Sequence, residues 1–380
     1  MKVVIKLIKK IGAIVGILLL LLAVIGGLFV NISPEFGGEH NEERIKIYSE
    51  SGHYKEGKFE NLIPTSMDMD FFGFIGVMGE FIKGNPTRQP KGDIPVNKMD
   101  SISLVNSPKS LTRIYWFGHS AFLLEIEGKN ILIDPMLGET PSPVPFMGAK
   151  RYSRSLPIEI EKLPKIDAVI LSHDHYDHLD YGSILKLKAK VSEFYMPLGV
   201  GAHLKEWGVD EEKIHELNWW DTISLDSLAF TCAPSRHFSG RGLTDRFTTL
   251  WGSWIIQSPT QTIYFSGDGG YGPHFKEIGE KYGPFDFAMM ECGQYNKQWA
   301  NIHMMPEETA QASVDLQAKM MMPIHWGAFT LALHSWTDPI ERVSVKAKEL
   351  GMPMTTPQIG EPIILNENIF PNSKWWKGIE

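Results

Sequence analysis

The segment Ser172–Asp180 (SHDHYDHLD) carries most of the chemistry that the sequence displays. It contains three histidines and three aspartates and follows directly after the apolar run AVIL. So many polar groups cannot be buried without partners. His173 and His175 alternate, whereas Asp177 and His178 are adjacent, so one tight turn can aim two pairs of ligands at two neighbouring points. We therefore expect metal binding here, with a solvated surface loop as the ordinary alternative.

The H-x-H-x-D-H pattern of residues 173–178 resembles the signature of the metallo-β-lactamase superfamily, and candidates for the remaining ligands follow in order at the ends of apolar runs. The resemblance implies two divalent metal ions. One would be held by His173, His175 and His237, and the other by Asp177, His178 and His325, with Asp268 bridging them. Imidazole and carboxylate ligands suit zinc, and iron or manganese would accept much the same set.

Longer strings look like the N-acyl-phosphatidylethanolamine-hydrolysing phospholipase D family and its bacterial relatives, over roughly residues 34–345. They are SGRG with TLWGSW, HMMPEE, IHWGAFTLA, and the arm PEFGG…GKFENLIPT. The resemblance implies a phosphodiesterase that releases an N-acylethanolamine and phosphatidic acid through attack by a metal-bridging hydroxide. Asp177 or Asp268 would orient the nucleophile, and His303 would contact substrate or donate a proton. The alternative for His303 is an ordinary residue just before the expected helix at 306–318.

Two other functions remain open. A lactonase or another ester hydrolase could use the same dimetal centre, and a non-catalytic, membrane-tethered module could bind metal without turnover. The complete set of ligands weighs against the second alternative. The chain has no G-x-S-x-G motif, so a serine nucleophile is not expected.

Several residues near these motifs are candidates for supporting roles. His119 in WFGHS and Asp134 in IDP resemble superfamily positions close to the site. Asp134 could accept a hydrogen bond from the free nitrogen of a ligating histidine, or it could be an ordinary turn residue before proline. Arg241, with Arg236 and Arg246, could clamp a phosphate, although arginines are commonly solvated surface groups.

Short β-rich runs, several ending in histidine or aspartate, alternate with a few helical stretches. The expected strands are RIYWFG, AFLLEIE and NILID around a turn at 128–130, AVILS, AFTCAP, LWGSWIIQ, TIYFS, DFAMME and MMMPIHW. Helices are expected at 181–190 and 306–318. This order predicts an α/β fold of two sheets packed face to face with helices outside. The resemblance implies that this fold is the metallo-β-lactamase αββα sandwich. The expected divisions are an anchor at 1–31, a linker and surface arm at 32–105, a catalytic domain at 106–365 and a tail at 366–380.

The first thirty residues resemble a membrane anchor. Four lysines precede an uncharged run from Ile11 to Val30, which is long enough to cross a hydrocarbon core of about 30 Å. A cleavable signal peptide would have a shorter apolar run and a small-x-small site, so we expect a retained anchor. The lysines predict a cytoplasmic N-terminus and an extracytoplasmic catalytic domain.

The overall charge indicates which classes of partner to expect, and the spacing of the cysteines indicates their chemical state. A net charge of −8 argues against a general nucleic-acid binder. The family resemblance implies instead a lipid or small-molecule phosphodiester substrate. Cys232 and Cys292 lie outside any zinc-finger spacing. Buried free thiols are the simpler expectation, and a disulfide is the alternative.

The segment Met67–Ile82 (MDMDFFGFIGVMGEFI) is apolar but lies outside the strand pattern. Core packing is the ordinary explanation. Alternatively, the segment rests in a lipid interface and forms one wall of an apolar groove that leads to the metals. Its three glycines weaken a helix.

Overall fold

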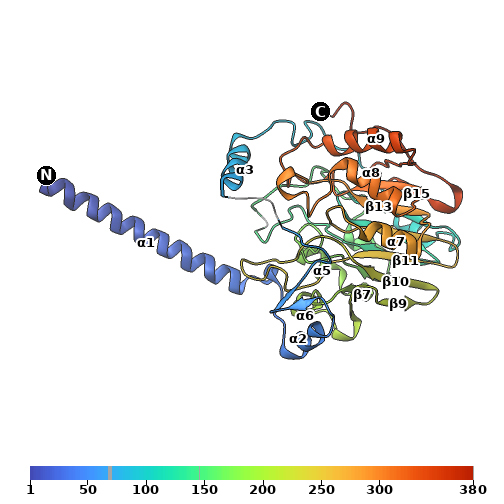
Figure 1. The fold of residues 1–380 in the computed structure, drawn as a ribbon, viewed down its shortest axis with the longest axis horizontal. Helices are drawn as coiled ribbons and strands as arrows, with labels where there is room; N and C mark the ends of the chain where they lie inside the picture. The colour runs from blue at the N-terminus through green and yellow to red at the C-terminus, as the bar shows by residue number, and fades with distance from the viewer. Residues whose placement is uncertain (67–70, 145, 380) are drawn as a thin grey trace.

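The computed structural model describes residues 1–66, 71–144 and 146–379, and two sheets packed face to face form its centre (Figure 1). The seven-stranded sheet has the order β15-β3-β4-β5-β6-β7-β8. Its strands are β3 (Arg113–Trp116), β4 (Phe122–Ile126), β5 (Lys129–Ile133), β6 (Ile166–Ile170), β7 (Val191–Pro197), β8 (Ile214–Leu217) and β15 (Pro362–Ile364). The six-stranded sheet has the order β14-β13-β12-β11-β10-β9. Its strands are β9 (Thr222–Leu225), β10 (Leu228–Ala233), β11 (Ser253–Gln257), β12 (Thr262–Phe265), β13 (Phe287–Glu291) and β14 (Met321–Ile324).

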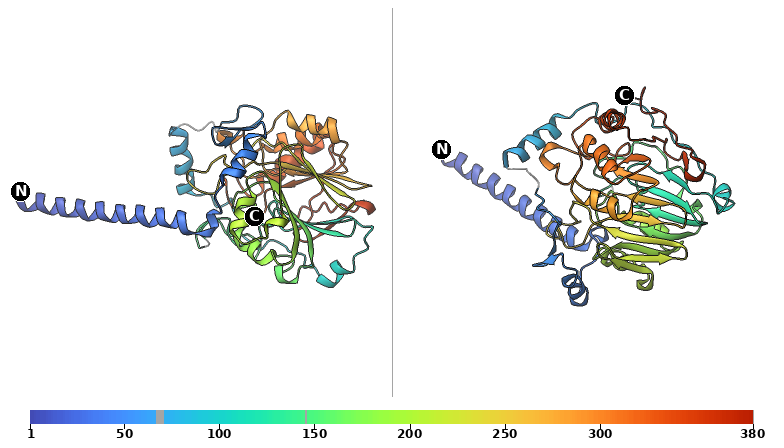
Figure 2. Two further views of the ribbon diagram at one scale, coloured as in Figure 1. Left: turned by 90° about the horizontal axis from the view of Figure 1, so that it is seen from below. Right: turned by 45° about the vertical axis from the view of Figure 1, so that its right-hand side comes forward.

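Helices cover the outer face of each sheet, which gives the predicted αββα sandwich (Figure 2). Helices α5 (Tyr181–Leu187) and α6 (Gly201–Glu206) lie on the seven-stranded sheet, and α7 (His274–Tyr282), α8 (Pro306–Asp315) and α9 (Asp338–Leu350) lie on the other. The remaining elements are α1 (Lys2–Ile32), α2 (Glu42–Ser49), the hairpin β1 (Tyr54–Lys55) and β2 (Lys58–Phe59), α3 (Phe71–Lys83) and α4 (Ser101–Val105).

The seven-stranded sheet is buried on both faces because its side chains alternate between two cores. On β5, Ile131 and Ile133 pack between the sheets, whereas Leu132 packs under α5 and α6. On β6, Ile170 faces the central core and Val169 faces the helices. Continuous apolar runs such as AVIL are the consequence of this two-sided burial.

Local sequence signals explain where several of the expected helices begin and where the expected hairpin turns. The β4–β5 hairpin turns at Glu127 and Gly128, whose positive φ values of 49° and 69° suit a two-residue turn, slightly earlier than predicted. Helix α5 begins after Asp180, which accepts a hydrogen bond from Ser183 N at 2.8 Å. Pro306 occupies the first turn of α8, as predicted.

Segments outside the sandwich also contribute to it. Tyr48 and Phe59, from the predicted linker and arm, and Trp375 and Trp376, from the predicted tail, are all buried in the central core. The boundaries of the predicted domains stay predictions. Cys232 and Cys292 are buried free thiols, as expected.

Two apolar helices lie outside the core. Helix α1 is long and apolar enough to cross a membrane, and its apolar window is not buried in the structure. The core packing expected for 67–82 is wrong for the part that the structure describes, because α3 is exposed along most of its length. Residues 67–70 of that segment lie outside the described residues.

Candidate metal centre

The predicted ligands meet at one edge of the sandwich, because the strands that carry them end there. The segment 172–178 follows β6, Asp134 follows β5, and Asp268, Glu291 and His325 come at or after the ends of the parallel strands β12, β13 and β14. The carboxyl ends of parallel strands open onto a common crevice. The chain thus brings residues that are far apart in sequence to one site.

Three histidines form the first cluster. Nδ1 of His175 lies 2.9 Å from Nε2 of His173 and 3.3 Å from Nε2 of His237. All three rings offer nitrogens within one small volume. Two ligands of a tetrahedral ion at a distance of about 2.0–2.1 Å would be about 3.3 Å apart, so these separations fit one ion.

The second cluster surrounds the carboxylate of Asp177. Its Oδ2 atom lies 2.9 Å from His119 Nε2, 3.7 Å from His178 Nε2 and 3.9 Å from His325 Nε2. His119 therefore belongs to this group, alongside the three residues that the sequence predicted for the second ion.

Asp268 lies between the two clusters and presents one oxygen to each. Its Oδ2 atom is 3.9 Å from His173 Nε2 and 3.8 Å from His237 Nε2. Its Oδ1 atom is 3.2 Å from His178 Nε2 and 3.1 Å from His325 Nδ1. This is the arrangement that a bridging carboxylate requires.

The donor atoms fit a cation. Asp134 accepts a hydrogen bond from His178 Nδ1 at 2.6 Å, which directs the Nε2 lone pair of that ring toward the site. Both His178 Nε2 and Asp268 Oδ1 are buried with no hydrogen-bond partner among the described residues. Although burial opposes it, Asp268, Asp177 and Asp134 raise the pKa of His178 well above its ordinary value, so this pair of atoms, 3.2 Å apart, calls for a positive charge, which a proton on His178 or a bound cation can supply.

The protonation states also favour metal binding. Burial lowers the pKa of His173, His237 and His325 well below the ordinary value, so these imidazoles are neutral. Burial alone would raise the pKa of Asp177 and Asp268, but the neighbouring histidines, His178 foremost, hold both well below their usual range. The carboxylates are therefore ionised at neutral pH.

Backbone strain collects at the same place. His119, Asp134 and His325 have φ values of 57°, 40° and 66°, a left-handed conformation that is uncommon outside glycine. Such strain persists where the surrounding structure enforces it, and it is concentrated at functional sites.

His303 lies beside the metal centre and is held from behind by Glu291. Nδ1 of His303 donates to Glu291 Oε1 at 3.1 Å, and Met304 N donates to Glu291 Oε2 at 3.0 Å. Burial raises the pKa of Glu291 to about 7. Although burial opposes it, the bond to Glu291 raises the pKa of His303. Glu291 was not predicted, but the rule that found His325 and Asp268, a polar residue ending an apolar strand, would have found it.

A cleft of about 210 Å³ opens onto this cluster. Its lining combines polar and apolar side chains. The polar ones are His175, Asp177, Asp268, Gln294, His303 and His325, and the apolar ones are Phe238, Trp299, Ile302 and Leu331.

The three candidate arginines do not line the cleft. Arg241 is buried and donates to the carbonyls of Asp174 and Leu179 at 2.6 and 2.8 Å, so it supports the ligand loop from behind and is not placed to clamp a phosphate. Arg236 donates to Tyr271 O, and Arg246 stacks 4.1 Å from the ring of Phe238.

Comparison with known proteins agrees with this site. A model of the beta-lactamase superfamily domain matches residues 129–326. The uncharacterized protein Rv0906 of Mycobacterium tuberculosis is 39% identical over 322 residues, 83% of this chain and 85% of that protein. N-acyl-phosphatidylethanolamine-hydrolyzing phospholipase D 1 of Caenorhabditis elegans is 33% identical over 228 residues, 57% of this chain and 64% of that protein.

A solved structure shares the fold. The isothiocyanate hydrolase from Delia radicum gut bacteria matches with a TM-score of 0.52 at 21% identity, covering 66% of this chain and 98% of that one. The sandwich fold and the cluster of metal-ligand residues are together those of a metal-dependent hydrolase. The chain belongs to the beta-lactamase superfamily.

Proposed function

We propose that the chain is a two-metal phosphodiesterase of phospholipase D type that acts on N-acyl-phosphatidylethanolamine-like lipids. The position of Asp268, with one oxygen toward each of two ligand clusters, is the observation that carries this proposal. A relative that is 33% identical is named for hydrolysis of this lipid class.

The two ions would be held by the clusters described above. His173, His175 and His237 would hold the first, Asp177, His178 and His325 the second, and Asp268 both. The donor set suits zinc, and iron or manganese would accept it too. When bound, two such ions lower the pKa of water to about 7 and polarise the phosphoryl oxygens.

The remaining groups position the reactants. Asp177, held by His119 at 2.9 Å, and Asp268 would orient the attacking water in line with the phosphorus. As the new oxygen–phosphorus bond forms, the bond from phosphorus to the ethanolamine oxygen breaks. His303, kept protonated by Glu291, would donate the proton that this leaving oxygen needs.

The shape of the cleft supports a lipid substrate. Four apolar side chains, Phe238, Trp299, Ile302 and Leu331, line the cleft together with the polar cluster. A lipid phosphodiester combines an anionic centre with apolar chains, so each part of the molecule would meet a matching surface.

We further propose that α1 anchors the protein in a membrane, with the catalytic domain on the extracytoplasmic side. The helix has a mean hydropathy of 3.0 over its apolar window, and its lysines all lie near the N-terminus. Such an asymmetry keeps the lysine-rich end in the cytoplasm.

A substrate panel tests the proposal. Full-length protein, purified in detergent and loaded with zinc, iron or manganese in turn, would be incubated with N-acyl-phosphatidylethanolamine, an acyl lactone and a β-lactam. We expect phosphatidic acid and N-acylethanolamine in equal amounts, abolished by a chelator and restored by metal. Lactone cleavage without phosphodiester cleavage would replace the proposal with the ester hydrolase alternative, and no turnover of any substrate would favour a binding module.

A further inference from the structure

Helix α3 exposes an unusual amount of apolar surface for a soluble domain. Its exposed large side chains include Phe74 at 50%, Ile75 at 52%, Met78 at 42%, Phe81 at 39% and Ile82 at 83%. At about 100° per residue these five fall within an arc of roughly 120°, a typical apolar stripe. Concentrated apolar surface of this kind marks a contact with another apolar phase.

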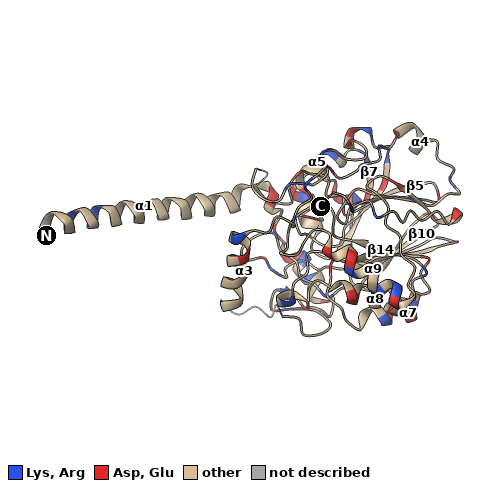
Figure 3. Cartoon of the chain, turned by 90° about the horizontal axis from the view of Figure 1, so that it is seen from above, with Lys and Arg blue, Asp and Glu red and all other residues tan. Residues whose placement is uncertain are grey.

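The opposite side of α3 is mostly small or charged, with Glu80, Lys83, Gly73 and Gly76. Phe72, 80% exposed, lies at the border of that side and adds to the apolar surface of the helix. Figure 3 shows that the charged residues of α3 gather at one end of the helix, while the rest of it is uncharged. A helix with one apolar and one polar face lies flat in a membrane interface and does not cross the bilayer.

The location of α3 favours a membrane over any other occupant. In Figures 1, 2 and 3, α3 lies on the side of the sandwich from which α1 projects. Since α1 is long and apolar enough to cross a membrane, a bilayer around it would face this same side of the protein.

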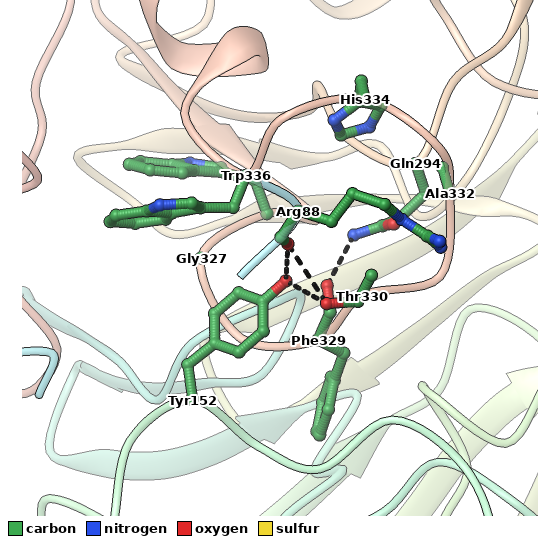
Figure 4. A pocket seen from close by; sticks show the side chains of 10 residues that line it. Arg88, Tyr152, Gln294, Gly327, Phe329, Thr330, Ala332, His334 and Trp336 are labelled. Carbon is green, nitrogen blue, oxygen red and sulfur yellow. Dashed lines mark hydrogen bonds between the residues drawn. The ribbon is translucent and has the colours of Figure 1, made fainter. Parts of the chain in front are cut away.

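A series of contacts connects α3 to the segment that carries Leu331, a residue of the cleft lining. The guanidinium of Arg88 stacks 4.4 Å from the ring of Phe81. The Arg88 carbonyl accepts hydrogen bonds from Tyr152 Oη at 3.0 Å and Thr330 Oγ1 at 3.2 Å (Figure 4). Leu331, the residue after Thr330, is one of the apolar side chains that line the cleft.

We propose that α3 docks in the interface of the membrane that α1 crosses, with its apolar stripe among the acyl chains. This inference rests on the proposed function, because it explains how a lipid reaches the site. Docking at α3 brings the bilayer surface to the Leu331 side of the cleft, so a phosphodiester can enter while its acyl chains stay in the membrane.

Depth measurements in proteoliposomes test the docking directly. The full chain would carry a nitroxide at Ile75→Cys or Ile82→Cys, and a control label at Val105→Cys, an exposed position on α4 at the end of the body far from α1 (Figure 3). The two native cysteines are buried and should not react. We expect labels at 75 and 82 to become accessible to oxygen and protected from a water-soluble nickel complex, whereas the label at 105 stays accessible to nickel.

Two results would overturn the inference. Labels at 75 and 82 as accessible to nickel as the label at 105 would show that α3 remains in water. Protection from both reagents would show burial against a second copy or another protein. The depth readout does not depend on catalysis, so it separates a failure of docking from a failure of the proposed function.

A kinetic comparison provides a second readout. Ile75→Asp with Ile82→Asp should lose most of the cleavage of long-chain lipid in vesicles while retaining cleavage of a short-chain soluble phosphodiester. Val105→Asp is the matched control and should change neither rate. A parallel loss on both substrates with a lower Tm would mean that α3 supports the fold, and the inference would fall.

Discussion

Glu291 Oε1 accepts a hydrogen bond from His303 Nδ1 at 3.1 Å, beside the metal centre and inside the protein. The carboxyl is fully buried, and its partner faces the cleft. The pair therefore links the interior of the fold to the place where a leaving group would need a proton.

This pair predicts a pH dependence of stability in chelator-treated protein. The pKa of Glu291 is raised by burial from 4.5 to about 7, so between these values the folded state holds a proton that the unfolded state releases. The free energy of unfolding should fall as pH rises through this window, by at most about 1.4 kcal/mol per pH unit for one proton. The raised pKa of His303 acts in the same direction.

Glu291→Gln, which stays neutral at every pH, should lack this component, so the free energy of unfolding of the unmodified protein should fall relative to that of the variant as pH rises from about 4.5 to 7. Urea unfolding at several pH values measures it, with the exposed Glu349→Gln as control. Parallel pH curves for Glu291→Gln and the unmodified protein would contradict the assignment.

Asp268→Ala should lose the carboxylate that would bridge the two metal ions. We expect fewer than two ions per chain by elemental analysis, and a fall in kcat greater than the about 10- to 100-fold typical of outer-shell partners. Asp210→Ala, whose side chain is 66% exposed, should keep both properties. Two retained ions with full activity in Asp268→Ala would refute the dimetal mechanism.

Asp134→Asn should weaken metal binding without removing a ligand. The amide cannot supply the charge that orients His178 through the 2.6 Å bond, so affinity should drop about 10- to 100-fold. Competition with a fluorescent zinc chelator measures this, and Asp93→Asn at the surface serves as control. Unchanged affinity would make Asp134 a turn residue only.

The orientation of α1 can be tested in spheroplasts of an expression host. Added protease should digest the catalytic domain while a cytoplasmic marker stays intact, if the lysines keep the N-terminus in the cytoplasm as proposed. Complete protection of the domain would reverse the predicted topology.

The sequence alone determined the local chemistry of this protein. His173 and His175 alternate, and Asp177 and His178 are adjacent, within one turn that follows one strand. Because this spacing is local, it can be recognised without knowledge of the fold. The apolar runs likewise predicted the strands, because a strand that is buried on both faces has a continuous run of apolar residues in the sequence.

Tertiary structure decided what lies behind and around those ligands. The contact of Glu291 with His303 depends on how β13 and the loop before α8 pack. Arg241 turns away from the cleft because nearby backbone carbonyls accept hydrogen bonds from its guanidinium. The sequence likewise left the exposure of α3 undecided, because an apolar segment has the same composition whether it packs in a core or faces a membrane. Long-range packing settles such questions, since it fixes which surfaces lose contact with water.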